Sequence, residues 1–280
     1  MKPLAVLCWA VATLVAAADV AAQDSFTLTY GFQKGKTYRM REIRSGNSMQ
    51  EMMGQEMKST GSGYTVTRLV VDEVAGDGSL VMTMAPDSMM FSVKSVRMDT
   101  TMVIEEMIGK RIRITVSKLG AITKREVIDS VQVQGMIRRT MAQRESFKLR
   151  VLPEKPVAVG TAWHSAVTDS IEGMGGYTLT STELDFQVAG KEPALGTSVL
   201  KITYSGTTTV KGKGKMMGAD FFTEGNGTLK GTLFFDAVRG LPLKDEFSFE
   251  RESTAVITGE QTMTIPGSES GTVTRLLLPD

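Results

Sequence analysis

Cysteine and histidine are nearly missing from this chain. Its 280 residues hold one of each, and aromatic residues make up 6% of the total. The one cysteine, Cys8, lies in an apolar N-terminal stretch, so the rest of the chain contains neither a disulfide nor a thiol nucleophile. One histidine cannot form the His or Cys cluster of a zinc site. We therefore expect a fold without such staples, in which burial of apolar side chains provides the stability.

An excess of one charge is also absent. The formal net charge is +1, and basic and acidic residues are scattered along the chain. This distribution excludes the basic stripe that nucleic-acid binding requires. One basic cluster stands out, at Arg138, Arg139, Arg144, Lys148 and Arg150. We interpret it as the solvated face of a helix; the alternative is contact with anionic lipid head groups.

Long apolar runs occur only at the N-terminus. Lys2 is followed by a nearly unbroken apolar stretch over 4–18 and by small residues at 20–22. This order is typical of a secretory signal peptide, and we expect cleavage after Ala22. Cys8 stands too early in the apolar stretch for a lipoprotein signal. The mature chain is therefore expected to be exported to the periplasm or the medium, with no transmembrane span.

No pattern of catalytic residues stands out. His164 is the only candidate for a base at neutral pH, and its neighbour Ser165 would point to the opposite face of a strand. A Gly-x-Ser-x-Gly elbow is absent, and so are Walker, Rossmann and EF-hand patterns. We predict a non-enzymatic protein that uses no cofactor and no metal.

Alternation of apolar and polar residues dominates the chain after the signal peptide. Over 111–117, Ile112, Ile114 and Val116 alternate with polar residues, which is typical of a half-buried strand. Three further stretches alternate in the same way: 79–84, 199–204 and 228–235. The short connections between such stretches favour antiparallel hairpins. The predicted fold class is mainly β, with curved, half-barrel-like antiparallel sheets.

Two stretches have helical spacing instead. The first is short, covers 103–108 and ends at Gly109, a residue that often follows a helix. The second covers 129–146 and predicts one principal amphipathic helix. Its apolar stripe consists of Val133, Met136, Ile137 and Met141.

The chain also repeats itself. Three pairs of similar segments occur in the same order and at similar separations, which is the signature of an internal repeat. The pairs are 35–38 with 160–163, 64–67 with 177–180, and 120–126 with 240–246. We therefore predict an internal duplication. The predicted organisation is a signal peptide (1–22), a first β unit (23–128), a helix with a Pro-rich connector (129–156) and a second β unit (157–280), the two β units forming one continuous domain or two.

Four segments carry a resemblance to a known family. They are 34–39 (Lys-Gly-Lys-Thr-Tyr-Arg), the Met-rich stretch 49–57, 108–110 (Ile-Gly-Lys) and the mid-chain stretch 152–163. On these segments the chain resembles a bacterial family of secreted proteins known only as a domain of unknown function, family 6263. The stretch 152–163 is the most specific part. The family has no established activity, so the resemblance implies no site residues.

Methionine is the one residue in unusual supply. The chain has 19 methionines, and Met49, Met52, Met53 and Met57 lie close together. Thioethers bind Cu(I), so a copper site is a minor alternative. Unbranched, polarizable side chains also suit an apolar lining that accepts varied ligands.

These observations lead to one prediction of function and two alternatives. We predict an exported protein that binds an apolar or amphiphilic ligand, such as a lipid, in the cell envelope. Ten apolar residues are expected to line the site: Leu80, Met82, Met84, Ile112, Ile114, Val116, Val133, Met136, Ile137 and Met141. The main alternative is a structural or protein-interaction module of the envelope, with a filled core and no ligand. A membrane-spanning barrel is disfavoured because the few aromatic residues do not form girdles.

Overall fold

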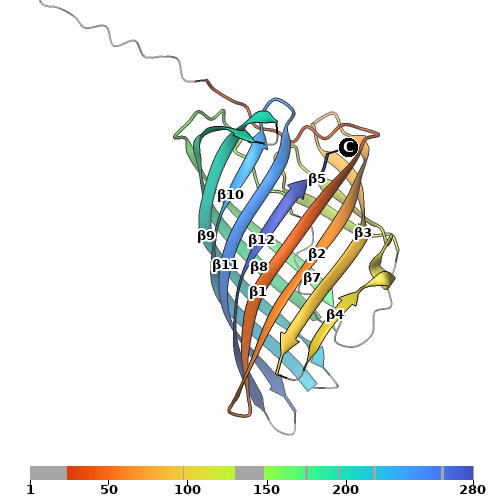
Figure 1. Ribbon diagram of the computed structural model, residues 1–280, viewed down its shortest axis with the longest axis vertical. Helices are drawn as coiled ribbons and strands as arrows, with labels where there is room; N and C mark the ends of the chain where they lie inside the picture. Colours follow the sequence, from red (N-terminus) through yellow and green to blue (C-terminus); the bar gives the residue numbers. More distant parts are fainter. Residues whose placement is uncertain are drawn as a thin grey trace, which may run out of the picture.

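The computed structural model describes residues 24–96, 98–129, 148–173, 176–194, 196–216, 219–259 and 262–279. These residues form one sheet of 12 strands, and every strand pairing in it is antiparallel (Figure 1). The mainly β prediction is therefore confirmed. The strands are β1 (Thr37–Met52), β2 (Gln55–Val74), β3 (Leu80–Ser95), β4 (Asp99–Val103), β5 (Ile112–Val116), β6 (Ile122–Val127), β7 (Ala162–Gly173), β8 (Gly176–Ala194), β9 (Thr197–Met216), β10 (Ala219–Asp236), β11 (Leu241–Thr258) and β12 (Met263–Leu277).

The sheet consists of two meanders joined by β12. Its order is β6-β5-β3-β2-β1-β12-β11-β10-β9-β8-β7, and β4 pairs with β3 beside this path. Apart from β4, which lies beside the path, strands that follow one another in the chain are neighbours in each half, as short hairpin connections require. β12 lies between β11 and β1, so strands of both predicted β units share one continuous sheet.

The two edge strands of the sheet face each other. Arg125 on β6 and Lys148 both approach the carboxylate of Asp169 on β7, at 3.9 Å and 3.3 Å. β6 and β7 are the first and the last strand of the order, so the ion pair between Arg125 and Asp169 shows that the sheet curls until its two edges meet. Figure 1 shows the long strands slanting around a common interior. We name this contact the seam.

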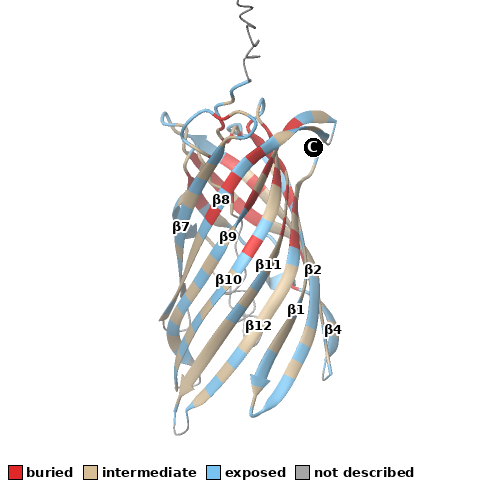
Figure 2. Ribbon diagram, turned by 90° about the vertical axis from the view of Figure 1, so that its left-hand side faces the viewer, coloured by how far each residue is buried: buried red, intermediate tan, exposed pale blue. Residues whose placement is uncertain are grey.

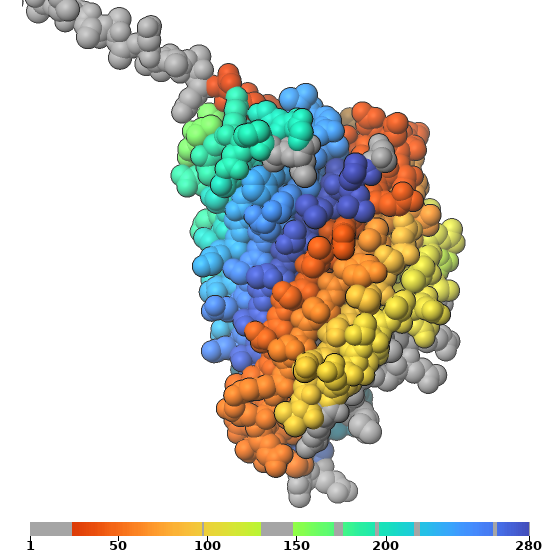
Figure 3. Space-filling model, viewed as in Figure 1, coloured from red at the N-terminus to blue at the C-terminus, as the bar shows by residue number. Residues whose placement is uncertain are grey.

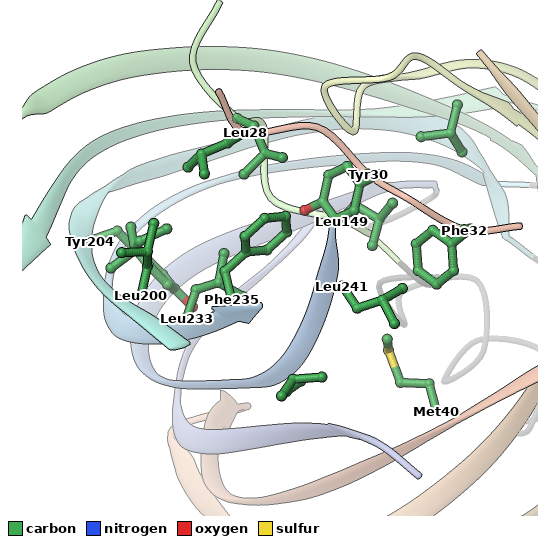
Figure 4. Close-up of a cluster of buried hydrophobic side chains, with 14 of the residues drawn as sticks. Leu28, Tyr30, Phe32, Met40, Leu149, Leu200, Tyr204, Leu233, Phe235 and Leu241 are labelled. Atoms are coloured by element: carbon green, nitrogen blue, oxygen red, sulfur yellow. The ribbon is translucent and has the colours of Figure 1, made fainter. Parts of the chain in front are cut away.

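One end of this interior is filled by apolar side chains. In Figure 2 the buried residues gather at the upper end of the strands, and the lower end contains mostly intermediate and exposed residues. The segment 24–36 crosses the upper end: its Tyr30 N–H donates to Lys118 O, and its Gly31 N–H donates to Gly240 O. The Tyr30 ring meets Phe235 edge to face at 5.7 Å. Figure 4 shows Leu28, Tyr30 and Phe32 pointing toward side chains of the sheet.

The prediction of a short helix over 103–108 is wrong. Val103 ends strand β4, and only Glu105–Met107 form a single turn of 3-10 helix. Six residues give too few hydrogen bonds to offset the cost of starting a helix. Gly109 (φ +75°) instead returns the chain to β3, because its N–H donates to Pro86 O. The described residues contain no α-helix. The expected helix over 129–146 lies outside them beyond Asp129, as does its whole apolar stripe.

The two meanders share several irregularities, although a bulge at Val66/Thr67 has no counterpart between β8 and β9. Gly35 and Gly160 both have positive φ (+75° and +89°) just before β1 and β7, and their N–H groups donate to Val71 O and Val188 O. The pairing is shifted by a bulge directly after Val71 and again directly after Val188. A second pair of bulges lies at 115–116 and 234–235. Tyr64 and Tyr177 do not align, because Tyr177 lies further from its bulge along the strand than Tyr64 does.

Candidate binding site on the inner face

The two faces of the sheet differ in chemistry. On β9 and β11 the outward residues are polar over most of each strand, whereas inward residues such as Ile202, Leu243 and Phe247 are buried. The outward residues are Lys201, Thr203, Ser205, Thr207, Thr209, Lys211 and Lys213 on β9, and Lys244, Glu246, Ser248, Glu250, Glu252 and Thr254 on β11. Figure 3 shows the outer surface, on which β12 lies directly beside β1. On these two strands the apolar side chains are therefore concentrated on the inner face.

Six of the predicted lining residues lie together on this inner face. Antiparallel register places Leu80 opposite Val116, Met82 opposite Ile114, and Met84 opposite Ile112. Five of the six are buried in the main apolar core with Leu28 and Phe32, and Ile112 packs against it half-buried. The shared face was therefore predicted correctly, but here it is tightly covered. Ligand binding by these residues stays a prediction, and Val133, Met136, Ile137 and Met141 lie outside the described residues.

A buried polar network crosses the inner face beside this core. Arg150 donates from Nε to Asp245 Oδ2 (3.0 Å) and from Nη2 to the Tyr204 hydroxyl (2.7 Å). The Tyr204 hydroxyl donates to the other oxygen of Asp245. Arg275 lies 3.5 Å from Asp245 Oδ2 and donates from Nε to Glu42 Oε2 at 2.8 Å. We name these five residues the polar network; its two guanidiniums are balanced by two carboxylates.

Burial sets the electrostatics of this network. The side chains of Arg150, Asp245 and Arg275 are 11%, 8% and 5% exposed. Burial, with the nearby Asp245 carboxylate, raises the pKa of the Tyr204 phenol above its ordinary range, although the Arg150 charge opposes the rise. Burial likewise raises the pKa of Tyr30, whose hydroxyl donates to Arg150 O at 2.8 Å. Both phenols therefore stay neutral and act as hydrogen-bond donors.

The interpretation of the basic cluster as a solvated helix face is wrong for its described members. The Arg150 guanidinium stacks over the rings of Tyr204 and Phe247, at 4.4 Å and 4.7 Å. Lys148 forms the seam contact with Asp169. Arginine can be buried in this way because its planar cation stacks on aromatic rings and matches carboxylates. Arg138, Arg139 and Arg144 lie outside the described residues.

A second charged group lies further along the same strands, and its charges are not balanced. Arg44 on β1 donates from Nη2 to Glu269 Oε1 at 2.8 Å. Arg251 on β11 donates from Nη2 to the other oxygen of Glu269. The Arg44 guanidinium also lies 4.9 Å from the ring centre of Phe249. We name Arg44 and Arg251 the arginine pair. Two positive charges share one negative charge there, and the three side chains are 29–32% exposed.

The arginine pair lines a pocket of about 210 Å³. Its walls include Ser48 and Ser59, whose hydroxyls are 2.7 Å apart, and the apolar side chains of Phe91 and Val93. Part of the space exists because Gly61 on β2 has no side chain. A Cβ built on Gly61 would meet nothing closer than Ser92 O at 3.8 Å. The pocket therefore combines positive charge, two hydroxyls and an apolar wall.

Beyond the pocket, the inner face becomes apolar again. Phe221 is paired with Ile257, and Ile257 with Met263, so these three side chains form one row across β10, β11 and β12. Ile265 follows in the next inward row, opposite Ala255. All of them are half-buried, in contrast to the fully buried core at the other end. We name Phe221, Ile257, Met263 and Ile265 the open apolar rows.

The other residues singled out from the sequence do not converge. The turn Met53-Gly54 closes the β1–β2 hairpin, with φ of 54° and 75°, and Met53 is 84% exposed. Met52 and Met57 lie on the inner side of this hairpin and Met49 on its outer side. His164 Nδ1 lies 2.9 Å from Asp185 Oδ1 on the neighbouring strand, and both side chains are exposed.

Within the described ranges, no group of three or more His, Cys, Asp and Glu side chains lies close enough to hold a metal ion. Among the same residues, none belongs to a helix with the length and apolar character needed to cross a membrane.

No family model and no curated protein matches this chain. The resemblance to family 6263 therefore stays a prediction. Several solved structures match this chain at low similarity. Neisserial surface protein A is 7% identical, with 86% of this chain and 97% of that chain covered, at a TM-score of 0.23. An outer membrane channel from Pseudomonas putida F1 is 9% identical, with coverage of 89% and 98% and a TM-score of 0.27. Pseudomonas aeruginosa OccK2 (OpdF) is 7% identical, with coverage of 88% and 99% and a TM-score of 0.26. These scores are too low to bear on function.

The arginine pair and Glu269 were missed in the sequence. A signal for them exists in the alternation of β11: Arg251 falls on the same face as Phe247 and Phe249. A charged residue on a largely apolar face is more informative than an exposed apolar one. Arg44 and Glu269 became neighbours only through the pairing of β1 with β12, which are far apart in the chain.

Proposed function

We propose that this chain is an exported, non-enzymatic protein of the cell envelope that binds an amphiphilic molecule inside its curved sheet. The observation that carries the proposal is the change along the inner face. The core around Phe235 is sealed at 0% exposure, whereas Phe221 on the same strand belongs to open apolar rows that are half-buried. Half-buried apolar rows on a concave face favour an apolar ligand over a packed core.

The outer face supports a carrier that is surrounded by water. A barrel that spans a lipid bilayer presents a continuous apolar band outward. Here the outward positions of β9 from Lys201 to Lys213 are Lys, Thr or Ser throughout. Such a surface is costly to place in hydrocarbon, because every lysine must be desolvated. The polarity of the two faces therefore fits a protein that encloses an apolar molecule.

The dimensions of the inner face fit an acyl chain. Along β11, Arg251 and Ile257 both point inward and are six residues apart. At about 3.3 Å per residue this is roughly 20 Å, close to the length of an extended long-chain fatty acid. The arginine pair at one end of this distance can bind a polar head group, and the open apolar rows at the other end can bind an apolar tail. A molecule with both parts is an amphiphile.

Binding of a neutral apolar dye tests this proposal. Phe221→Asp places a charge in the open apolar rows and is expected to reduce binding of N-phenylnaphthylamine at least tenfold. The neighbouring Phe222→Asp is the matched control, because Phe222 points outward and is 47% exposed. Native mass spectrometry of protein taken from its own envelope then gives the mass of the natural ligand. Equal dye binding by both variants and the unmodified protein would exclude an inner site.

The alternative function is a structural or protein-interaction module of the envelope without a ligand. The tightly packed core around Leu28 and Met82 favours it, because a sealed core needs no occupant. A protein that binds neither dye nor lipid after delipidation is expected under this alternative. Copper binding is a weaker candidate, since Met49 lies on the other side of the hairpin from Met52 and Met57.

We also propose that the two meanders arose by internal duplication. The matching turns at Gly35 and Gly160 and the matching bulges after Val71 and Val188 support this. Bulges are specific features and tend to be retained within a fold. The misaligned pair Tyr64 and Tyr177 contributes nothing to the argument.

A further inference from the structure

We infer that the amphiphile carries an anionic head group, a carboxylate or a phosphate, and that Arg44 and Arg251 bind its oxygens. The inference rests on the proposed function and assigns the ligand's chemistry at the same inner face. It starts from the unbalanced charge: two guanidiniums share the single carboxylate of Glu269. One further negative charge would make the group neutral.

The hydrogen-bonding capacity of the arginine pair agrees with this charge count. A guanidinium has five N–H donors. Arg44 and Arg251 each donate one hydrogen bond from Nη2 to Glu269. Among the described residues, neither guanidinium donates a hydrogen bond to any other protein group. The planar fork of arginine matches the two oxygens of a carboxylate or phosphate. Donors therefore remain for an oxyanion placed in the pocket that both residues line.

The polar network is the internal comparison, and it lacks this capacity. There, Arg150 and Arg275 are balanced by Asp245 and Glu42, and the two arginines are 11% and 5% exposed. The arginine pair is 30–32% exposed, which leaves it accessible from the pocket. A buried and balanced network stabilises the fold, whereas an accessible and unbalanced one offers a site for an anion.

The apolar side chains around the pocket favour an amphiphile over a small ion as the ligand. Phe91 and Val93 form an apolar wall beside the charged groups. The open apolar rows then continue in the same direction along β11 and β12. An acyl chain that extends from the pocket would cover these apolar side chains. Inorganic phosphate would leave them exposed to water.

The test compares a fluorescent fatty acid, 11-(dansylamino)undecanoic acid, with its methyl ester. The unmodified protein is expected to bind the acid at least about tenfold more tightly than the ester, the effect of a charge-assisted hydrogen bond. Arg44→Gln and Arg251→Gln are each expected to remove this preference while ester binding stays the same. Arg41→Gln is the matched control, because Arg41 lies on the outward face of the same strand and is exposed.

A pocket-filling variant tests the location. Gly61→Leu fills the pocket without a backbone clash, because the nearest atom to a Cβ there is 3.8 Å away. It is expected to weaken acid binding at least tenfold, with a melting temperature within a few degrees of the unmodified protein. Retained acid binding in a folded Gly61→Leu variant would place the head group elsewhere and overturn the inference.

The remaining outcomes separate the two proposals. Equal binding of acid and ester by the unmodified protein would overturn the anionic head group and leave the apolar site standing. Binding of neither probe would overturn both. Displacement of the acid by millimolar inorganic phosphate, with no binding of the ester, would assign the site to a small oxyanion and overturn the amphiphile. Acid preference that survives in both glutamine variants would exclude the arginine pair.

Discussion

The two ends of the inner face are built from the same strands but reach opposite states. On β11, Leu243 and Phe247 at one end are 5% and 8% exposed, while Ile257 at the other end is half-buried. Part of this difference lies in the strand residues, because the inward positions toward the open end include small and polar residues such as Thr208 on β9, Gly225 on β10 and Ser253 on β11. The sealed end is covered by the segment 24–36, which is bonded to Lys118 and Gly240. Among the described residues, the core therefore forms where large inward side chains of the sheet are also covered by this segment.

The charged groups follow the same division. The polar network lies against the sealed core and has as many carboxylates as guanidiniums, whereas the arginine pair lies toward the open end with one carboxylate for two guanidiniums. A charge buried without a partner is costly, so balance is required at the sealed end. At the half-exposed end, water reduces that cost, and an unbalanced group is tolerated.

The largest expected effect is truncation of the sealed core. Phe235→Ala removes a ring that is 0% exposed and packed edge to face on Tyr30. We expect the free energy of unfolding to fall by about 3–5 kcal/mol. Phe221→Ala on the same strand is expected to cost about 1 kcal/mol, because that ring is already half-buried. Urea unfolding followed by tryptophan fluorescence measures both; equal losses would mean that the open end is as tightly packed as the sealed end.

Loss of one partner in the polar network comes next. Asp245→Ala leaves the guanidiniums of Arg150 and Arg275 buried with one carboxylate fewer, and we expect about 3 kcal/mol of destabilisation. Glu269→Ala at the arginine pair is expected to cost less than about 1 kcal/mol, since those side chains are in part hydrated. A loss at Glu269 as large as that at Asp245 would contradict the distinction between the two groups.

Most of the sheet could be predicted from the sequence, because alternation is a local signal. The stretch 111–117 contains β5 with Ile114 and Val116 inward, as expected. The positive φ of Gly35 and Gly160 agrees with the repeat that marks the entry to each meander. The 3-10 turn at Glu105–Met107 was mistaken for a helix, because apolar spacing over six residues does not distinguish a turn from a helix.

The site could not be predicted to the same extent, because long-range pairing creates it. Arg44 and Glu269 meet through the β1–β12 register, which no local pattern contains. The predicted lining residues Met82 and Ile114 do face inward, but alternation cannot show that the segment 24–36 covers them. The cover decides whether an apolar face is a core or a groove. Sequence patterns identify the face, and packing decides its use.

A smaller effect is expected from alkaline pH at the sealed end. Burial raises the folded-state pKa of Tyr30 and Tyr204, so both phenols remain protonated when the unfolded chain begins to ionise near pH 10. Their contribution to stability is complete below about pH 10 and is lost as the pH rises further. Absorbance at 295 nm should show two tyrosines that ionise only with unfolding. In the double variant Tyr30→Phe, Tyr204→Phe, the absorbance change that accompanies unfolding should vanish. An absorbance change of unchanged size would mean that other tyrosines produce it.

The smallest effect on stability is expected at the seam, where it also separates closure of the sheet from packing of its core. Asp169 forms ion pairs with both Arg125 and Lys148, and its side chain is 24% exposed. Asp169→Asn should lower the free energy of unfolding by less than about 1 kcal/mol, because ion pairs that remain in contact with water contribute little. The edge of β7 should nevertheless open more often, since Asp169 joins it to Arg125 on β6 and to Lys148. Hydrogen exchange is expected to quicken at backbone amides of β7 and to stay unchanged in the core strand β10.

Asp99→Asn is the control, because its pair with Lys94 is exposed and lies away from the seam. Unchanged exchange in β7 would show that the ion pairs do not hold the two edges together.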